Sequence, residues 1–206
     1  MRGCFMRSIL LWLMVLCGAV FLTPTARSAA TPCQPAELFL AGNPDAPSEL
    51  QADATILRNG ASVQGSTPLD GVYWSAPLRQ TASEPSREFH LCVPEGPTLH
   101  DVAEALRHQF AQEAVLTFDY LPQNAPGADA VAIRVPDVDA ARLRAAFTAD
   151  SPAHDRLLGA SVTTTDHTLI LVAAQGDLDD ARRLIGEAGG DWEAATTAYG
   201  RREVVR

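Results

Sequence analysis

The sequence predicts a small two-layer α+β domain preceded by a short β-hairpin segment. Between residues 88 and 188, short apolar strands alternate with stretches whose apolar residues recur at helical spacing, in the order β-α-β-β-α-β-β-α. Clusters of Gly, Pro and Asp separate these elements. We therefore divide the chain into a signal peptide (1–30), a Pro/Ala-rich segment with a hairpin (31–87), the α+β domain (88–188) and a tail (189–206).

Residues 1–30 have the three-part pattern of a secretory signal peptide. Two arginines precede an apolar run over residues 8–22, and Ser28 and Ala30 are small enough for cleavage after Ala30. The run is shorter than the roughly 20 residues that a membrane-spanning helix needs. We expect a cleaved leader, an exported protein in the periplasm or the secreted fraction, and no transmembrane segment after its removal.

Two cysteines, Cys33 and Cys92, lie outside the predicted leader. In an oxidising compartment an isolated pair favours a disulfide, and two free thiols are the alternative. The pair lacks the Cys-X-X-Cys spacing that is typical of redox-active sites. We therefore predict a structural bond that ties the N-terminal segment to the first strand of the domain.

The charge balance excludes several kinds of function. All 16 basic residues are Arg, so neither a Walker loop lysine nor Schiff-base chemistry is available. The chain carries 25 acidic residues and a net charge of −9. An acidic protein gains nothing from counterion release on nucleic acid or anionic lipid, so neither is an expected partner.

The secondary structure follows from turn residues and apolar periodicity. Asn59-Gly60 suits a two-residue turn and predicts a hairpin over residues 54–64, after an irregular stretch at 31–49. Downstream, the pattern predicts strands at 89–93, 114–121, 130–135, 161–165 and 168–172, and helices at 98–110, 137–147 and from residue 177 onward.

Aspartates mark the predicted starts of two helices. Residues 136–144 (PDVDAARLR) and 176–184 (GDLDDARRL) share Asp, Asp, Ala and Arg at an offset of 40. General acid–base pairs and calcium ligands are the alternatives, but no EF-hand pattern surrounds these acids. Caps and favourable helix-dipole positions explain the aspartates sufficiently, so we infer neither a site nor a duplication.

The strongest candidate for a chemical site is the trio His100, Glu104 and His108. A spacing of four places these residues on one helical face, where they could bind a metal ion in a hydrolase. They lie opposite the apolar stripe of the same helix, and no nearby Cys or His completes the four ligands of structural zinc. We expect a solvated face, and we interpret His90 and His167 as structural or exposed. The sequence therefore predicts no catalytic residue, cofactor or metal.

Residues 89–172 resemble the short N-terminal (STN) domain that secretins and TonB-dependent outer-membrane transducers share. The turn 92–99 (CVPEGPTL) leads into 102–106 (VAEAL), as a strand and turn lead into a helix in that family. Residues 115–120, 131–147 and 161–172 are similar to the strand, the strand-helix unit and the closing hairpin that follow. A neighbouring secretin domain is similar to residues 168–185. Residues 31–87 lie outside the resemblance.

The resemblance implies a contact role between proteins rather than catalysis. We expect a non-enzymatic periplasmic adaptor in outer-membrane signalling, secretion or uptake, engaging its partner by strand addition to a sheet edge. One alternative is a periplasmic immunity or inhibitor protein whose acidic charge steers a basic toxin or lytic enzyme. The other is a metal-dependent hydrolase built on His100, Glu104 and His108.

Overall fold

The computed structural model describes residues 33–42, 46–75, 78–94 and 98–206, and the predicted signal peptide lies outside them. This part of the chain forms eight strands and five α-helices. The elements are β1 (Gln34–Ala41), α1 (Ala46–Arg58), β2 (Ser62–Ser75), β3 (Gln80–Val93), α2 (Thr98–Gln109), β4 (Val115–Tyr120), β5 (Ala130–Val135), α3 (Ala140–Ala149), α4 (Ser151–Arg156), β6 (Gly159–Thr163), β7 (Leu169–Ala174), α5 (Leu178–Glu187) and β8 (Thr196–Val205).

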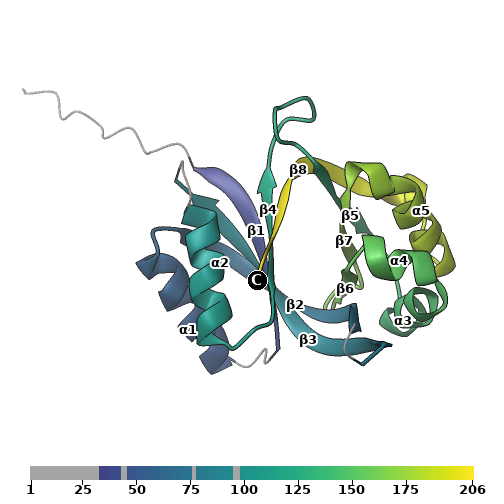
Figure 1. Ribbon diagram of the computed structural model, residues 1–206, viewed down its shortest axis with the longest axis horizontal. Coiled ribbons are helices and arrows are strands. Elements are labelled where there is room, and N and C mark those ends of the chain that lie inside the picture. Colours follow the sequence, from purple (N-terminus) through teal and green to yellow (C-terminus); the bar gives the residue numbers. More distant parts are fainter. Residues whose placement is uncertain (1–32, 43–45, 76–77, 95–97) are drawn as a thin grey trace, which may run out of the picture. The chain divides into compact units, whose positions relative to one another are not determined.

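The strands form one closed antiparallel barrel in the order β1-β3-β2-β6-β7-β5-β8-β4. The chain runs twice through a β-α-β-β-α-β unit, first from β1 to β4 and then from β5 to β8. Pairing of β2 with β6 and of β4 with β8 joins the two units. Helices α1 and α2 lie beside the first unit, and α3 to α5 lie beside the second (Figure 1).

The predicted two-layer domain is therefore wrong, because two barrel strands lie in segments for which the sequence predicts an irregular stretch and a tail. β1 lies in the Pro/Ala-rich stretch, where Ala36, Leu38 and Leu40 alternate toward the helices. β8 lies in the predicted tail. Residue 88, the expected domain boundary, falls inside β3. Two more strands close the sheet on itself instead of leaving a layer with free edges.

The predicted hairpin over residues 54–64 is also wrong. Asn59-Gly60 ends α1 instead of linking two strands. Gly60 has a φ of 89°, its N–H donates to Leu57 O, and the N–H of Ala61 donates to Ile56 O. These two bonds are those of a Schellman motif, which requires the same left-handed glycine that a type I′ turn prefers.

The helix starts of the second unit differ in detail from the expected caps. The side chain of Asp139, not Asp137, caps α3 by accepting from Arg142 N, and Asp137 has a φ of 58°. Asp177 occupies the N-cap position of α5 without a side-chain hydrogen bond. Residues 148–155, predicted as a loop, hold all of α4 but its last residue, and the N-cap Asp150 accepts from Ala153 N.

Alternation along each strand divides apolar and polar side chains between two faces. On β3, Phe89 and Leu91 pack against the helices of the first unit, and Glu88 and His90 point into the barrel. The second unit packs a separate apolar cluster against α3, α4 and α5. A smaller cluster around Phe118 fills part of the interior. The rest of the interior holds the polar groups described below.

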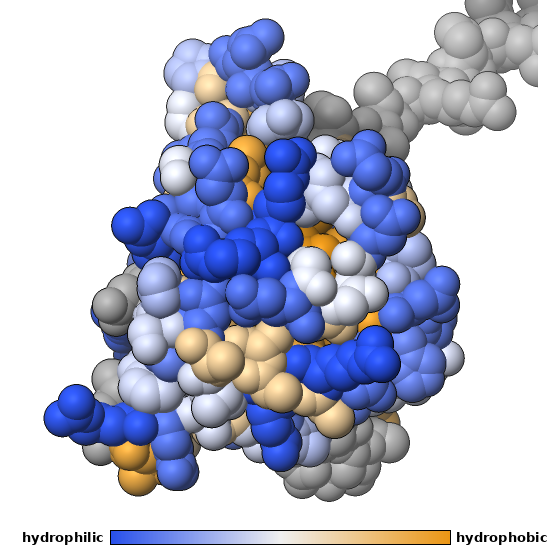
Figure 2. All heavy atoms as spheres, turned by 90° about the vertical axis from the view of Figure 1, so that its right-hand side faces the viewer, coloured by the Kyte–Doolittle hydropathy of each residue, from blue (hydrophilic) through white to orange (hydrophobic). Residues whose placement is uncertain are grey.

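The predicted disulfide is confirmed. Cys33 and Cys92 are bonded, with their Cα atoms 5.2 Å apart, and the bond ties the start of β1 to the end of β3. None of the helices in the described segments has the length and apolar character to cross a membrane. The outer surface that carries α3 to α5 is mainly hydrophilic (Figure 2).

Candidate functional site: a polar network inside the barrel

The interior of the barrel holds an ion pair that spans it. Three strands separate β5 from β3 in either direction around the barrel, so the contact between Arg134 on β5 and Glu88 on β3 crosses the interior. Both carboxylate oxygens of Glu88 accept from the Arg134 guanidinium, with Nη1 to Oε2 at 3.2 Å. This bidentate geometry fixes the guanidinium plane.

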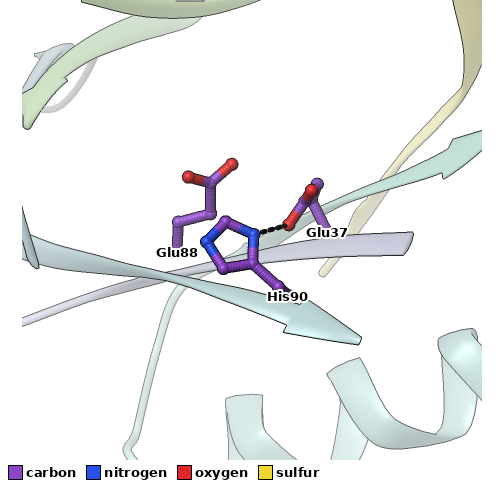
Figure 3. A group of neighbouring side chains, drawn as sticks. All are labelled: Glu37, Glu88 and His90. Atoms are coloured by element: carbon purple, nitrogen blue, oxygen red, sulfur yellow. Dashed lines mark hydrogen bonds and ion pairs between the residues drawn. The ribbon is translucent and has the colours of Figure 1, made fainter. Parts of the chain in front are cut away.

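A second line of contacts runs through His90, which faces Glu37 across the β1–β3 ladder. Nδ1 of His90 donates to Glu37 Oε2 at 2.7 Å, and Nε2 lies 3.0 Å from the hydroxyl of Thr67. Tyr120 donates its phenolic hydrogen to Glu37 Oε1 at 2.8 Å. Figure 3 shows Glu37, Glu88 and His90 on the sheet face turned away from the helices. Arg134 Nη2 lies 3.8 Å from Glu37, so the two lines form one network.

The local sequence explains why these side chains meet. Glu88 and His90 are two residues apart, so both point to the face opposite Phe89. On β2 the register with β3 shifts between Val63 and Gly65, so one extra residue forms a bulge beside His90. Bulges redirect side chains and are common next to functional sites. A Cβ on Gly65 would lie 3.8 Å from His90 Cδ2, so the glycine leaves the ring uncovered on that side.

Burial and pairing shift the pKa values of these groups in opposite directions. The hydrogen bond to Glu37 raises the pKa of His90 against the opposing effect of burial. Burial raises the pKa of Glu88, although Arg134 opposes the shift. Burial and the charge of Glu37 raise the pKa of Tyr120 to about 12. Burial alone would lower the pKa of Arg134, but Glu88 and Tyr120 raise it. Pairing with Glu37 thus favours the charged form of His90, whereas burial disfavours the charged form of Glu88.

The order Thr67–His90–Glu37 has the connectivity of a hydroxyl nucleophile, a base and an orienting acid. The raised pKa of His90 weakens it as a base, because the imidazole must be neutral to accept a proton. Glu37 also accepts a hydrogen bond from Tyr120, so its carboxylate does not serve His90 alone. The geometry therefore holds the groups in place more than it activates a nucleophile.

Glu37, Glu88 and His90 also form a possible metal site, with one ligand atom from each within 4.8 Å of the others. A metal ion would have to compete with Arg134 for Glu88 and with the Nδ1 proton of His90 for Glu37. The guanidinium would then lie beside a dication without its bidentate partner. The donor set therefore fits an ion-pair network better than a metal centre.

The structure does not bring the predicted trio on α2 together at one centre. His100 Nδ1 contacts Glu203 on β8 at 2.8 Å, whereas Glu104 pairs with Arg107 at 2.9 Å and with His108 at 2.8 Å. The hydrogen bond from Arg107 is the largest cause that lowers the pKa of Glu104 to about 2. His167, at a φ of 55°, lies in the turn between β6 and β7.

The interior network is not among the sites that the sequence predicts. The sequence predicts a structural or exposed role for His90 and an irregular segment around Glu37. The one available signal was the alternation of polar with apolar residues: Glu88 and His90 flank Phe89 near the end of β3, and Arg134 lies in an otherwise apolar β5. Such residues indicate a polar interior once both faces of the strand are known to be covered.

Comparisons with known proteins assign no family. No known family and no curated protein matches the sequence. Three solved structures show weak similarity. An anthrone oxidase-like protein is 11% identical over 86% of this chain and 94% of its own, with a TM-score of 0.26, and a protein described as a glycine cleavage system transcriptional repressor is 10% identical over 81% of this chain and 97% of its own, with a TM-score of 0.28. A protein described as a monooxygenase from Fusobacterium nucleatum is 11% identical over 86% of this chain and 94% of its own, with a TM-score of 0.21. These scores are too low to support either a fold relationship or a function.

Proposed function

We propose that the chain is an exported, non-enzymatic binding protein. The observation that carries the proposal is that the interior groups able to make or break bonds are engaged with one another. Both nitrogens of His90 are occupied, and both oxygens of Glu37 and of Glu88 accept hydrogen bonds. A network satisfied in this way rigidifies a barrel and presents fixed donors, which suits recognition.

Export rests on the leader pattern of residues 1–30 and is supported by the bond between Cys33 and Cys92, since disulfides persist in oxidising compartments. An adaptor role in outer-membrane signalling, secretion or uptake is the finer form of the proposal. Strand addition needs an edge that pairs on one side only. Among the described strands, β2 before Leu69 and β3 before Ser86 pair on one side, and Pro68 and Pro85 interrupt those edges. Residues 171–174 of β7 and the two halves of β8 on either side of Gly200 also pair on one side, so a partner has these edges as well as side chains to contact.

The net charge of −9 favours a second role, inhibition or immunity against a basic toxin or lytic enzyme. The same experiment separates the two. The full chain is exported in a bacterial host, purified, immobilised and used to capture proteins from periplasmic and outer-membrane extracts. An envelope component in stoichiometric amount supports the adaptor, and a basic lytic enzyme supports the inhibitor.

A turnover assay tests the non-enzymatic claim itself. The purified protein is incubated with ester, peptide, phosphoester and glycoside probes, and His90→Gln is the matched variant. We expect no turnover above the buffer rate. Turnover that the wild-type protein shows and the His90→Gln variant loses would establish an enzyme and overturn the proposal.

A further inference from the structure

The network presents its cationic side to solvent. The side chain of His90 is 35% exposed and that of Arg134 is 29% exposed, whereas those of Glu37 and Glu88 are 9% and 0% exposed. The carboxylates thus lie behind the two cations and orient them. A ligand that enters the barrel meets N–H donors first, not carboxylate oxygens.

Arg134 keeps hydrogen-bonding capacity for a ligand. A guanidinium has five N–H groups. Its contacts with Glu88 use one hydrogen on each terminal nitrogen, Nη2 also lies 3.8 Å from Glu37, and the Tyr120 hydroxyl hydrogen-bonds the guanidinium. Glu88 and Tyr120 together engage three of the five N–H groups. The other two have no hydrogen-bond acceptor among the contacts of the described residues and are available to a planar acceptor such as a carboxylate.

The same barrel face carries a further cation. Arg202 lies opposite Phe118 in the β4–β8 ladder and therefore on the face that points inward. Its Nη1 is buried and has no hydrogen-bond partner within the described part of the chain. Buried polar groups are normally satisfied, so an unpaired guanidinium nitrogen indicates a missing acceptor.

Charge and the neighbouring apolar side chains then indicate the class of ligand. With His90 protonated, three cations (His90, Arg134 and Arg202) and two carboxylates (Glu37 and Glu88) lie on the inward face, so one negative charge balances this set and the two charges of a phosphate exceed it. Apolar side chains lie next to the network: Phe39 and Leu116 are half-buried, and Phe118 packs edge-on against Tyr120 at 5.0 Å. These surfaces suit a small apolar body.

We propose that the barrel interior binds a small monocarboxylic acid, whose carboxylate contacts Arg134 and whose apolar body packs against Phe39 and Leu116. This inference rests on the proposed binding function and names its ligand class.

Binding weakens as pH rises, because His90 loses its positive charge and its Nε2 then accepts the Thr67 hydrogen that a ligand would otherwise receive. The groups that face His90 from the surrounding strands are Glu37 (β1), Thr67 (β2), Glu88 (β3) and Arg134 (β5).

Calorimetric titration of the full exported protein with benzoate, butyrate and inorganic phosphate tests the inference at pH 6 and pH 8. We expect saturable 1:1 binding of benzoate and butyrate, stronger at pH 6, and at least tenfold weaker binding of phosphate. The E88Q/R134Q variant removes both charges of the pair and so leaves no buried charge unpaired. It should lose at least about tenfold in benzoate affinity, which corresponds to one charge-assisted contact.

Arg144→Gln is the matched control, because Arg144 is an exposed arginine on α3 whose Nε donates to Ser83. Its benzoate affinity should equal that of the wild-type protein. Equal binding of phosphate and benzoate, equal benzoate affinity in E88Q/R134Q, or no saturable binding of either acid would each overturn the carboxylate site. Protein capture that persists in E88Q/R134Q would leave the binding function standing, whereas turnover of a probe would remove it.

Discussion

Substitution of Arg134 by Ala tests the barrel-spanning ion pair most severely. Glu88 is fully buried and both its oxygens accept from Arg134. Loss of the cation leaves a buried, unpaired carboxylate, which costs about 3–5 kcal/mol of unfolding free energy. In a domain of this size each kcal/mol corresponds to about 2–4 °C, so the melting temperature should fall by roughly 10 °C. Urea unfolding at pH 7 with the disulfide intact measures the loss.

The pH dependence of this variant provides an independent check. Without Arg134, burial raises the pKa of Glu88 with less opposition, so the folded state holds its proton more tightly than the unfolded state does. A raised carboxyl pKa favours folding at low pH and disfavours it as pH rises through the folded pKa. The gap in stability between Arg134→Ala and wild type should therefore shrink from pH 8 to pH 5.

The double variant E88Q/R134Q controls for lost packing. It should stay within about 1 kcal/mol of wild type, since the Coulombic gain of a buried pair is largely offset by its desolvation. A loss below about 1 kcal/mol in Arg134→Ala, or a loss that does not change with pH, would refute the buried pair.

Three further predictions concern other parts of the molecule. His90→Gln should flatten the decline of unfolding free energy above pH 6.5. A raised imidazole pKa stabilises the fold fully below the unfolded pKa of about 6.5, and this stabilisation is lost as pH rises through the folded pKa. Urea unfolding from pH 5.5 to 9 measures the decline, and the control variant at an exposed histidine, His100→Gln, should keep more of it. Replacing Cys33 and Cys92 by Ser should lower the unfolding free energy by about 4 kcal/mol, the chain-entropy value for a separation of 59 residues. Thermal unfolding measures the loss, benzoate binding should not change, and a stability equal to that of the wild-type protein would contradict the prediction. Gly200→Ala should destabilise the β4–β8 ladder by several kcal/mol (~3), because the new Cβ would lie 2.3 Å from Asp119 O, and a folded variant of normal melting temperature would count against the register.

Sequence patterns located the regular elements of the central part of the chain. The strand at residues 130–135 and the start of α2 at Thr98 were predicted from apolar periodicity, and both agree with the structure. The pairing of Cys33 with Cys92 followed from cysteine count and compartment. These features are local, or depend on one residue type, and so can be read without knowledge of the fold.

Barrel closure and the interior network could not be predicted in the same way. The prolines and alanines around β1 favour an irregular segment, so the sequence does not indicate a strand there. β8 is recognisable only through its pairing with β4 and β5. Glu88 reaches Arg134 across 46 residues of sequence and through the middle of the barrel. No periodicity records such a contact, because the polar residues of one strand show which face they share but not which residue of another strand they meet.

The Asn59-Gly60 dipeptide shows how one local preference serves two structures. A left-handed glycine suits both a tight hairpin and a helix end. The apolar residues that pack α1 into the core, Ala52 and Ile56, decide between them. Their spacing of four is helical, and this pattern upstream of the dipeptide was the available evidence against a hairpin.

The most direct measurement of the central claim is the ¹⁵N NMR spectrum of the Arg134 guanidinium, assigned with Arg134→Lys and recorded with and without benzoate. We predict separate Nη–H signals at pH 7, because the bidentate contact with Glu88 restricts rotation of the guanidinium, and guanidinium signals that shift on addition of benzoate as the acid binds. Nη–H signals averaged by free rotation would contradict the barrel-spanning contact, and signals that benzoate leaves in place would contradict the presentation of Arg134 to a ligand.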